Sequence, residues 1–260
     1  MKIFRSPAEW QPQPGTGFIP TMGALHAGHI ALVERARAEC QTVVASLFVN
    51  PTQFNNPEDF EKYPVTFEDD CWMLEAAGCD YVFAPTYPLL YPDDYRLRVT
   101  ETELSKVLEG EHRPGHFDGM LTVVLKLLQV IRAERAYFGE KDYQQLLLVQ
   151  ELVQAFFVGT EIVPCPTVRE PDGVAMSSRN RRLNPAQRAL ATKWAALLAD
   201  LSLAPIEVRE KLEALGFTVD YIEDRWGRRL GAVHTPSIED GPIVRLIDNV
   251  EDRWARRLGP

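Results

Sequence analysis

Residues 17–49 read GFIPTMGALHAGHIALVERARAECQTVVASLFV. Within this stretch, Gly17 to Pro20 predicts a short strand and Val43 to Val49 predicts a buried one. Between the two apolar runs, His29 to Cys40 has helical composition with apolar residues on recurring faces. A strand, a helix and a second strand form a βαβ unit, whose two strands lie parallel in one sheet. The stretch therefore predicts an α/β fold built on a parallel sheet.

The same alternation continues along the chain to about residue 168. Strands that alternate with helices predict a doubly wound parallel sheet with helices on both faces. The further elements are strands at Tyr81–Phe83, Ala136–Phe138 and Glu161–Val168, a helix capped by Thr66 that ends before Gly78, and helices at Met120–Ile131 and Asp142–Phe157.

The pattern changes after Arg169, where a polar loop leads to Asn184-Pro185, a helix N-cap followed by proline. We therefore predict two domains, a larger α/β domain over residues 1–172 and a smaller α+β domain over residues 173–260. The elements expected in the smaller domain are helices to about Leu201 and at Ile206–Leu215, and strands at Thr218–Glu223 and Ile243–Ile247.

Two nearly identical segments lie in this smaller domain, EDRWGRRLG at residues 223–231 and EDRWARRLG at residues 251–259. Two copies do not make a repeat architecture. Their many charges favour an exposed surface segment.

Composition narrows the classes of function. The 260 residues are 45% hydrophobic and 25% charged, as in ordinary globular proteins. Their net charge of −9 argues against a nucleic-acid partner. The start MKIFRSPAEW has no apolar core of a secretory signal, and no apolar run is long enough to span a membrane. The scattered cysteines contain no CxxC pair, so we expect free thiols in a cytoplasmic protein.

The turn after the first strand, Met22 to His29, is a candidate phosphate site. Ligands bind such sheets at the carboxyl ends of strands, where free backbone N–H groups and a helix N-terminus suit phosphate. Gly23 and Gly28 would let the backbone approach a ligand. His26 and His29 share one helix face and can donate hydrogen bonds to a polyphosphate. A helix cap, a buried structural histidine and a chance metal pair remain alternatives; the spacing is not that of the HExxH zinc motif.

The HxGH pattern in this position resembles the signature of the nucleotidyltransferase superfamily, whose members attack the α-phosphate of a nucleotide. Such enzymes often carry a later phosphate-binding motif around lysine or serine. Residues 176–179, MSSR, fit that description, because two hydroxyls and a guanidinium can hold departing pyrophosphate. Lys141, which follows another predicted strand, is a further candidate phosphate contact. Alone, MSSR would be read as a surface turn.

Amide side chains form a second candidate site. Gln53 follows the second strand within FVNPTQF, residues 48–54, where uncharged amides beside aromatic rings can bind hydroxyls and a carboxylate. Phe48 and Phe54 would wall an apolar group there. Gln145 either faces the same edge of the sheet or forms a capping box with Asp142.

Five segments in this order resemble the pantoate–β-alanine ligase family: PTMGALHAGH, FVNPTQF, EGEHRPGHFDG, GEKDYQQ and TVREPDGVAMSSRN. The match is close over residues 17–185 and weaker to residue 249. The resemblance implies a Rossmann-like domain, a smaller C-terminal α+β lid domain and a homodimer. It also implies that ATP, with Mg²⁺, activates pantoate as a pantoyl adenylate, which β-alanine then converts to pantothenate.

The resemblance also assigns individual residues. His29 matches the family's proton donor, and His26 and Lys141 would help to neutralise phosphate charge. Gln53 and Gln145 would contact pantoate, and Gln53 also β-alanine. Asp70 would be a Mg²⁺ ligand, although a helix-dipole role is the commoner explanation for an acidic residue in a first turn. The residues that match nucleotide contacts are Met22, Gly23, Ala24, Leu25, His26, Ala27, Gly28, His29, Gly139, Glu140, Lys141, Asp142, Val168, Met176, Ser177, Ser178 and Arg179.

Two other classes of function stay open at this point. One is another nucleotidyltransferase, such as an adenylyltransferase with a second phosphorylated substrate or a tRNA-synthetase fragment. The amide pocket has too few basic groups for the first, and the net charge of −9 disfavours the second. The other class is a non-catalytic nucleotide sensor, which would not need both MSSR and the amide pocket.

Overall fold

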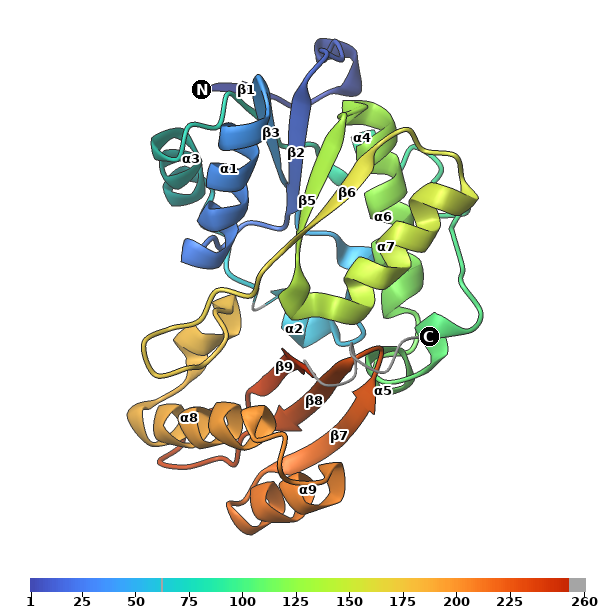
Figure 1. Ribbon diagram of the computed structural model, residues 1–260. Helices are drawn as coiled ribbons and strands as arrows, with labels where there is room; N and C mark the ends of the chain where they lie inside the picture. Colours follow the sequence, from blue (N-terminus) through green and yellow to red (C-terminus); the bar gives the residue numbers. More distant parts are fainter. Residues whose placement is uncertain (62, 253–260) are drawn as a thin grey trace. The chain divides into compact units, whose positions relative to one another are not determined.

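The computed structural model describes residues 1–61 and 63–252 (Figure 1). The chain forms two compact units. The first comprises residues 1–140 and 144–166, and the second comprises residues 141–143 and the chain from Thr167 onward. The sequence pattern placed the division after residue 172, whereas the second compact unit begins at Thr167 and also includes the Lys141 segment.

The described residues of the first unit contain a six-stranded sheet with the order β1-β4-β3-β2-β5-β6, in which every pair of neighbours is parallel. From β2 the chain adds strands outward to β4, then returns to the other side of β2 with β5 and β6. The order reverses between β2 and β5, which is where such sheets bind ligands. The predicted doubly wound sheet is confirmed. Its strands are β1 (Lys2–Phe4), β2 (Thr16–Thr21), β3 (Thr42–Leu47), β4 (Tyr81–Phe83), β5 (Arg135–Gly139) and β6 (Glu161–Cys165).

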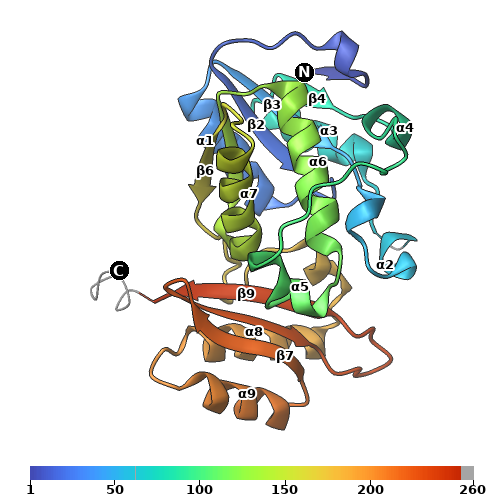
Figure 2. The ribbon, with the colours of Figure 1, turned by 90° about the vertical axis from the view of Figure 1, so that its right-hand side faces the viewer.

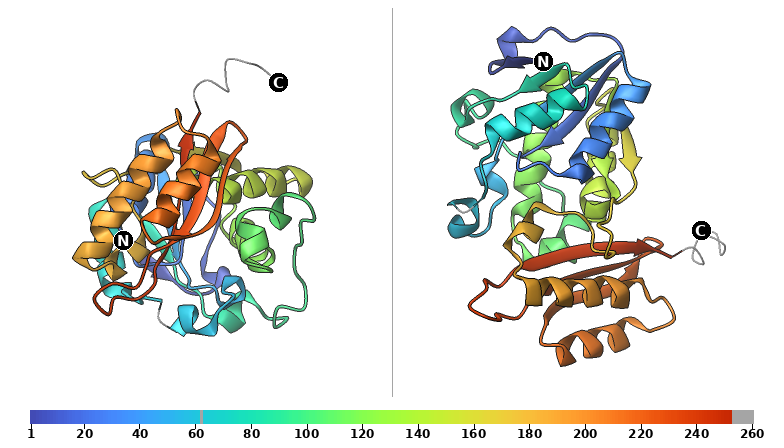
Figure 3. Two further views of the ribbon diagram at one scale, coloured as in Figure 1. Left: turned by 90° about the horizontal axis from the view of Figure 1, so that it is seen from below. Right: turned by 90° about the vertical axis from the view of Figure 1, so that its left-hand side faces the viewer.

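Helices cover both faces of this sheet. Figure 2 shows α6 (His116–Ile131) and α7 (Tyr143–Ala155) on one face, and the right-hand view of Figure 3 shows α1 (Ala27–Glu39) and α3 (Phe67–Ala76) on the other. The core between α1, α3 and the sheet contains buried Ile19, Val43, Leu74 and Val82. The shorter helices are η1 (Pro7–Glu9), η2 (Pro51–Gln53), α2 (Pro57–Glu61), α4 (Tyr87–Leu90), η3 (Leu104–Lys106), α5 (Glu109–His112) and η4 (Glu140–Asp142).

The second unit is an α+β domain. Its antiparallel strands β7 (Thr218–Arg225), β8 (Arg228–His234) and β9 (Arg245–Glu251) lie in that order, with α8 (Pro185–Ala199) and α9 (Pro205–Ala214) side by side on one face (Figure 3, left). A short helix, η5 (Ser178–Arg182), precedes them. Asn184 caps α8 in a capping box with Gln187, which confirms the predicted helix start. Trp194 and Leu212 are fully buried in the core.

The first EDRW segment is the exposed charged segment that we expected only in part, because Glu223, Asp224 and Arg225 are exposed whereas Arg228 and Arg229 are buried. It forms the hairpin between β7 and β8, and both Trp226 and Gly227 take positive φ values at its turn. Arg228 and Arg229 are only 7% and 3% exposed, because Asn249 and Asp224 accept their hydrogen bonds. The second segment, beyond residue 252, lies outside the described residues.

In residues 1–61 and 63–252, no helix combines the length and apolar character needed to cross a membrane. Cys40, Cys71, Cys79 and Cys165 are free thiols within that same part of the chain.

Candidate active site

The turn between β2 and α1 lies at the carboxyl end of β2, beside the reversal of strand order. Its backbone takes two successive left-handed conformations, with φ of 84° at Gly23 and 52° at Ala24. A Cβ atom on Gly23 would lie 2.8 Å from a carboxylate oxygen of Asp70. Glycine is therefore required at position 23 by both backbone conformation and space.

Asp70, from α3, organises this turn. It is 3% exposed; its Oδ2 accepts a hydrogen bond of 2.9 Å from the backbone N–H of Ala24, and its Oδ1 accepts one of 2.8 Å from that of Leu25. Contrary to our expectation, Thr66 does not cap α3 with its side chain but donates its hydroxyl proton to Asp70 Oδ2 at 3.1 Å. The N–H groups expected to be free for phosphate thus donate within the protein.

These contacts also decide whether Asp70 fits a metal ion. A Mg²⁺ ligand must turn a carboxylate oxygen toward the ion and its bound waters. Both oxygens of Asp70 instead face N–H or O–H donors of the protein, and the side chain is buried. The residues around Asp70 do not fit the expected Mg²⁺.

His26 is the N-cap of α1, which is one of the alternatives considered for it. Its Nδ1 accepts a hydrogen bond of 3.1 Å from the N–H of Gly28. We assign its proton to Nε2 from this bond, because an accepting Nδ1 carries a lone pair. His29 lies alongside, with 4.1 Å between the two ring centroids. The turn therefore presents adjacent imidazoles, of which His26 offers an N–H donor at Nε2.

The amide pocket adjoins this turn. Gln53 is 9% exposed; its Oε1 accepts a hydrogen bond of 3.0 Å from the amide of Asn50. Its amide nitrogen contacts the sulfur of Met22 at 3.1 Å. Met22 is the residue just before the Gly23 turn, so one contact joins the two predicted sites within the first unit.

Tyr91 supports the pocket, and sequence reasoning missed it. Its hydroxyl donates to Oδ1 of Asn50 at 3.0 Å, and Thr52 donates to the same oxygen at 3.0 Å. Burial raises the pKa of Tyr91 to about 12, so the hydroxyl keeps its proton at neutral pH and acts as a donor. These bonds fix the Asn50 amide so that its nitrogen faces Gln53. No local pattern around Tyr91 signals this role.

A second group missed from the sequence is His116, at the start of α6. Its Nδ1 lies 2.8 Å from the carbonyl oxygen of Gln53, and its Nε2 lies 3.1 Å from the guanidinium of Arg113. Both residues belong to the EGEHRPGHFDG segment, which could have signalled them. Of the two aromatics expected to wall the pocket, Phe48 is buried near Tyr91, whereas Phe54 packs edge-on to other rings.

The adjacent glutamines at the start of α7 have different environments. Gln144 is buried; its amide donates to the carbonyls of Leu104 and Val107 at 2.7 and 2.9 Å, and its Oε1 accepts from the N–H of Glu109. Gln145 is half-buried. Gln144 is therefore structural, and the substrate role expected for Gln145 stays a prediction.

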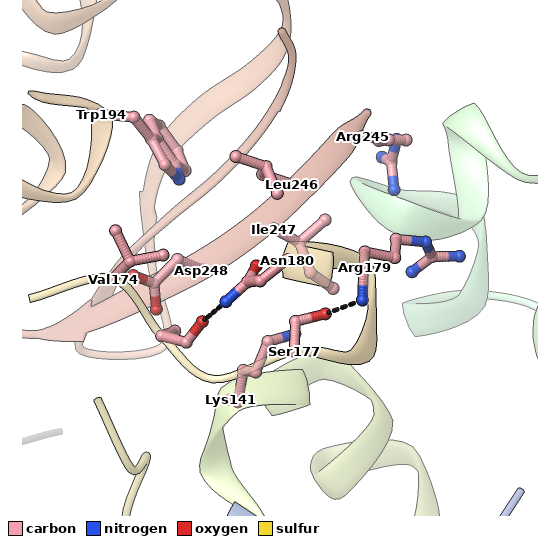
Figure 4. A pocket seen from close by; sticks show the side chains of 11 residues that line it. Lys141, Val174, Ser177, Arg179, Asn180, Trp194, Arg245, Leu246, Ile247 and Asp248 are labelled. Atoms are coloured by element: carbon pink, nitrogen blue, oxygen red, sulfur yellow. Dashed lines mark hydrogen bonds between the residues drawn. The ribbon is translucent and has the colours of Figure 1, made fainter. Parts of the chain in front are cut away.

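The second unit brings the other candidate phosphate contacts together. Ser177 caps η5 by accepting the N–H of Arg179 at 3.3 Å, and the N–H of Met176 donates to the carbonyl of Val168 at 3.0 Å. A cavity of about 10 Å³, the size of about one water, lies beside this segment (Figure 4). Its lining includes Lys141, Ser177, Arg179, Asn180, Trp194 and Asp248.

An ion-pair network braces the same segment. Arg188 of α8 pairs with Glu170 at 2.8 Å and with Asp172 at 2.6 Å, and the Glu170 carboxylate also accepts the amide of Asn180. These bonds tie the loop that leads into MSSR to α8. Of the remaining predicted nucleotide contacts, Gly139 ends β5 and Glu140 begins η4 in the first unit, while Asp142 and Ser178 belong to the second.

Comparison with known proteins agrees with these features. The family model described as pantoate–β-alanine ligase matches residues 2–251. A pantothenate synthetase of Bdellovibrio bacteriovorus is 52% identical over 236 residues, which cover 89% of this chain and 94% of the relative. One of Legionella pneumophila is 47% identical over 245 residues, covering 92% and 97%.

Solved structures of pantoate–β-alanine ligases and pantothenate synthetases are also similar to this chain. The pantoate–β-alanine ligase of Francisella tularensis, complexed with "Beta-gamma ATP and Beta-alanine", superposes with a TM-score of 0.87 at 40% identity, covering 97% of this chain and 98% of its own. A pantothenate synthetase of Thermus thermophilus superposes with a TM-score of 0.87 at 41% identity, covering 97% and 99%. With this likeness along nearly its whole length, the chain belongs to the pantoate–β-alanine ligase family.

Proposed function

We propose that this member of the family joins pantoate to β-alanine in two steps through a pantoyl adenylate. In the first step, a carboxylate oxygen of pantoate attacks the α-phosphorus of ATP, the bond to the β-phosphate oxygen breaks, and pyrophosphate leaves. In the second, the amine of β-alanine attacks the activated carbonyl, the bond to AMP breaks, and the amine loses a proton. No covalent bond to the protein is required.

The contact between Met22 and Gln53 carries this proposal. It joins the turn that bears His26 and His29 to a pocket of amide side chains. Amides can hold the carboxylate and hydroxyls of a hydroxy acid, whereas a second phosphorylated substrate would need cations. A carboxylate held by Gln53 would lie beside the nucleotide turn, as attack on an α-phosphate requires. A nucleotide sensor would have no use for this second pocket.

Charge stabilisation accounts for most of the catalysis in this proposal. The first step develops negative charge on the phosphoryl oxygens and on pyrophosphate, and donors aimed at that charge lower the barrier. His26 offers its Nε2 proton, and we assign to His29 the family role of proton donor. The other donors are Lys141, Ser177, Ser178 and Arg179, all in the second unit.

The remaining assignments follow the resemblance. Residues 22–29, Gly139, Glu140, Asp142, Val168 and Met176 would surround the rest of the nucleotide, although the N–H groups of Ala24 and Leu25 are already engaged with Asp70. Gln145 would hold pantoate together with Gln53. Mg²⁺ stays an expectation that accompanies ATP, and no step is routed through it.

Exchange of labelled pyrophosphate into ATP tests the first step. We expect exchange that depends on pantoate and needs no β-alanine, because adenylate formation is reversible before the amine arrives. Exchange without pantoate would indicate another adenylyltransferase. Pantothenate formation without any exchange would overturn the two-step scheme.

We also infer a homodimer formed through the first unit, which rests on the resemblance. Sedimentation velocity at micromolar concentration should give the mass of two chains. A monomer would contradict the inference, and a dimer lost only on deleting residues after Arg169 would assign the interface to the second unit. The cytoplasmic location stays a prediction, which cell fractionation can test.

A further inference from the structure

We propose that Asp70 is a positioning residue that holds the nucleotide turn in its binding conformation and is not a Mg²⁺ ligand. The inference rests on the role proposed above for the turn from Met22 to His29. Asp70 touches neither the reacting atoms nor, in this proposal, a metal ion. Its effect on the reaction passes through the backbone of Ala24 and Leu25.

The first observation is the geometry of the carboxylate. Its two oxygens accept hydrogen bonds from the N–H groups of consecutive residues, at 2.9 Å from Ala24 and 2.8 Å from Leu25. Only an acceptor with two parallel oxygens can take both of these donors, and an amide of the same shape cannot. Thr66 adds a hydroxyl donor at 3.1 Å, which leaves Asp70 3% exposed.

The second observation is that the turn needs an external brace. Ala24 has φ of 52°, a left-handed conformation that residues other than glycine adopt reluctantly. Ala24 and Leu25 are both fully buried, so no water can take their N–H protons. Gly23 completes the arrangement, because its N–H donates to Thr21 at 3.2 Å. The N–H groups of Gly23, Ala24 and Leu25 thus all donate to other groups of the protein, and Asp70 accepts those of Ala24 and Leu25.

The third observation is what the turn holds at its two ends. Met22 precedes it and contacts Gln53, while His26 follows it and caps α1 with Nδ1. A change in the backbone at Ala24 or Leu25 therefore moves both the pocket contact and the imidazole donor. Small displacements of such groups lower the reaction rate by large factors, because catalysis depends on how the groups are oriented toward the substrate.

Charge explains why a carboxylate is tolerated beside a phosphate site. An anion near a triphosphate repels it unless nearby donors take up the negative charge. The Ala24, Leu25 and Thr66 donors do so for Asp70. A metal ion at Asp70 would have to share a carboxylate that is 3% exposed with these donors.

The Asp70→Asn substitution distinguishes a positioning role from a role as a Mg²⁺ ligand. Asp69→Asn is its matched control. Asp69 is the preceding residue in the same acidic turn of α3, is exposed, and loses the same charge on substitution. ATP binding is measured by calorimetry, once with Mg²⁺ and once with a chelator and no divalent ion. The measurement needs no turnover, so its outcome is independent of whether an adenylate forms.

A positioning role predicts that Asp70→Asn weakens ATP binding by roughly tenfold or more in both buffers, since the turn is disturbed whether or not a metal is present. Asp69→Asn should bind ATP as the unaltered chain does. A loss confined to the Mg²⁺ buffer would assign Asp70 to the metal and overturn the proposal. Unchanged binding in both buffers would also overturn it.

A circular dichroism spectrum shows whether Asp70→Asn folds. If it does not, Thr66→Val provides a second test of the proposal. Valine keeps the shape of threonine and removes only the hydroxyl donor to Asp70, because this hydroxyl makes no cap bond to α3. We expect a smaller loss of ATP binding, equal with and without Mg²⁺. In steady-state ligation, KM for ATP should rise while KM for β-alanine stays constant, and a uniform loss of kcat alone would contradict the proposal.

Discussion

The side-chain amide of Asn249 donates a hydrogen bond of 2.8 Å to the main-chain carbonyl of Lys141, 108 residues earlier in the sequence. Asn249 is 2% exposed, and its own oxygen accepts from Arg228 at 2.8 Å. The same arginine stacks its guanidinium 4.2 Å from the ring centre of Tyr143. These contacts explain why residues 141–143 belong to the second unit although both of their neighbours in sequence belong to the first. Lys141 is thereby fixed to the sheet of the second unit.

Asn249→Ala should weaken catalysis through Lys141. The change leaves the Lys141 carbonyl and the Arg228 guanidinium without the buried amide, which costs about 1–3 kcal/mol of folding free energy. If Lys141 contacts phosphate, its displacement should also lower kcat/KM for ATP by roughly 10- to 100-fold. Steady-state kinetics and a urea unfolding curve measure the two effects separately.

A double-mutant cycle tells positioning from general destabilisation. In a Lys141→Ala background, Asn249→Ala should cost little further activity, because the side chain on which it acts is already gone. Its cost in stability should persist, because the Arg228 contact is still lost. Activity losses that simply add in the double variant would show that Asn249 acts by another route.

Gln53→Ala should impair the use of pantoate and spare ATP. The buried hydroxyls and carboxylate of the substrate would lose a partner worth ~1–3 kcal/mol, so KM for pantoate should rise by roughly 10- to 100-fold. Gln53→Glu should also impair the use of pantoate, because it keeps an acceptor for Asn50 but adds a charge that repels the carboxylate. Calorimetry with ATP checks the assignment. An equal loss of ATP binding in both variants would mean that Gln53 supports the turn through Met22 and not the substrate.

The βαβ alternation was predictable because it depends on local features of the sequence, namely apolar runs and the caps of individual helices. Strand β8 was not predictable in this way. It begins with two arginines, and local patterning places such charges on the surface. Arg229 is instead buried by pairing with Asp224 at 2.7 Å and Arg228 by Asn249 at 2.8 Å. Both partners come from neighbouring strands, so the charge becomes compatible with burial only after the sheet has formed.

The candidate site shows the same limit. The glycines and histidines of the nucleotide turn were recognisable from their spacing, but the partners of its N–H groups were not. Asp70 lies 46 residues from Ala24, and nothing in the local sequence links the two. Its place in an acidic first turn suggested a helix-dipole or metal role. Long-range hydrogen bonds of this kind become visible only in the folded chain.

Gln145→Glu should reduce turnover by electrostatic repulsion. The new carboxylate would face that of pantoate, and two like charges ~4 Å apart repel by about 1–4 kcal/mol at dielectric constants between those of water and a protein surface. KM for pantoate should therefore rise by roughly tenfold or more. Gln150→Glu, farther along α7, adds the same charge to the same helix and should change little. Unchanged turnover in Gln145→Glu would favour the capping-box interpretation, since glutamate would still cap.

His26→Asn should separate the two tasks of His26. Asparagine is a good N-cap, so α1 should keep its stability, whereas His26→Ala should lose about 1 kcal/mol, or ~2–4 °C in Tm. Both variants lack the Nε2 proton that His26 offers to phosphate. Their kcat/KM for ATP should therefore fall together while their unfolding temperatures differ. Full activity in His26→Asn would show that capping is the only task of this imidazole.

His29→Ala should separate the two half-reactions. We assign His29 to the phosphates, whose charge changes mainly while pyrophosphate leaves. Removal of one preorganised donor of this kind typically costs ~2.7–4 kcal/mol, or ~10²–10³ in rate. The variant should therefore slow pantoate-dependent pyrophosphate exchange by about that factor. Because His29 is half-buried and follows the cap residue by one helical turn, an unfolding curve is needed to confirm that α1 stays intact.

The second half-reaction supplies the internal comparison. Pantoyl adenylate that is supplied ready-made keeps only its α-phosphate, so less charge remains for His29 to stabilise. Its conversion by β-alanine should slow by roughly tenfold or less, a smaller factor than for exchange. Single-turnover kinetics can follow both steps with one preparation of the variant. Equal losses would mean that His29 serves amine attack or general folding, because only a role at the departing pyrophosphate makes the two steps unequal in this direction.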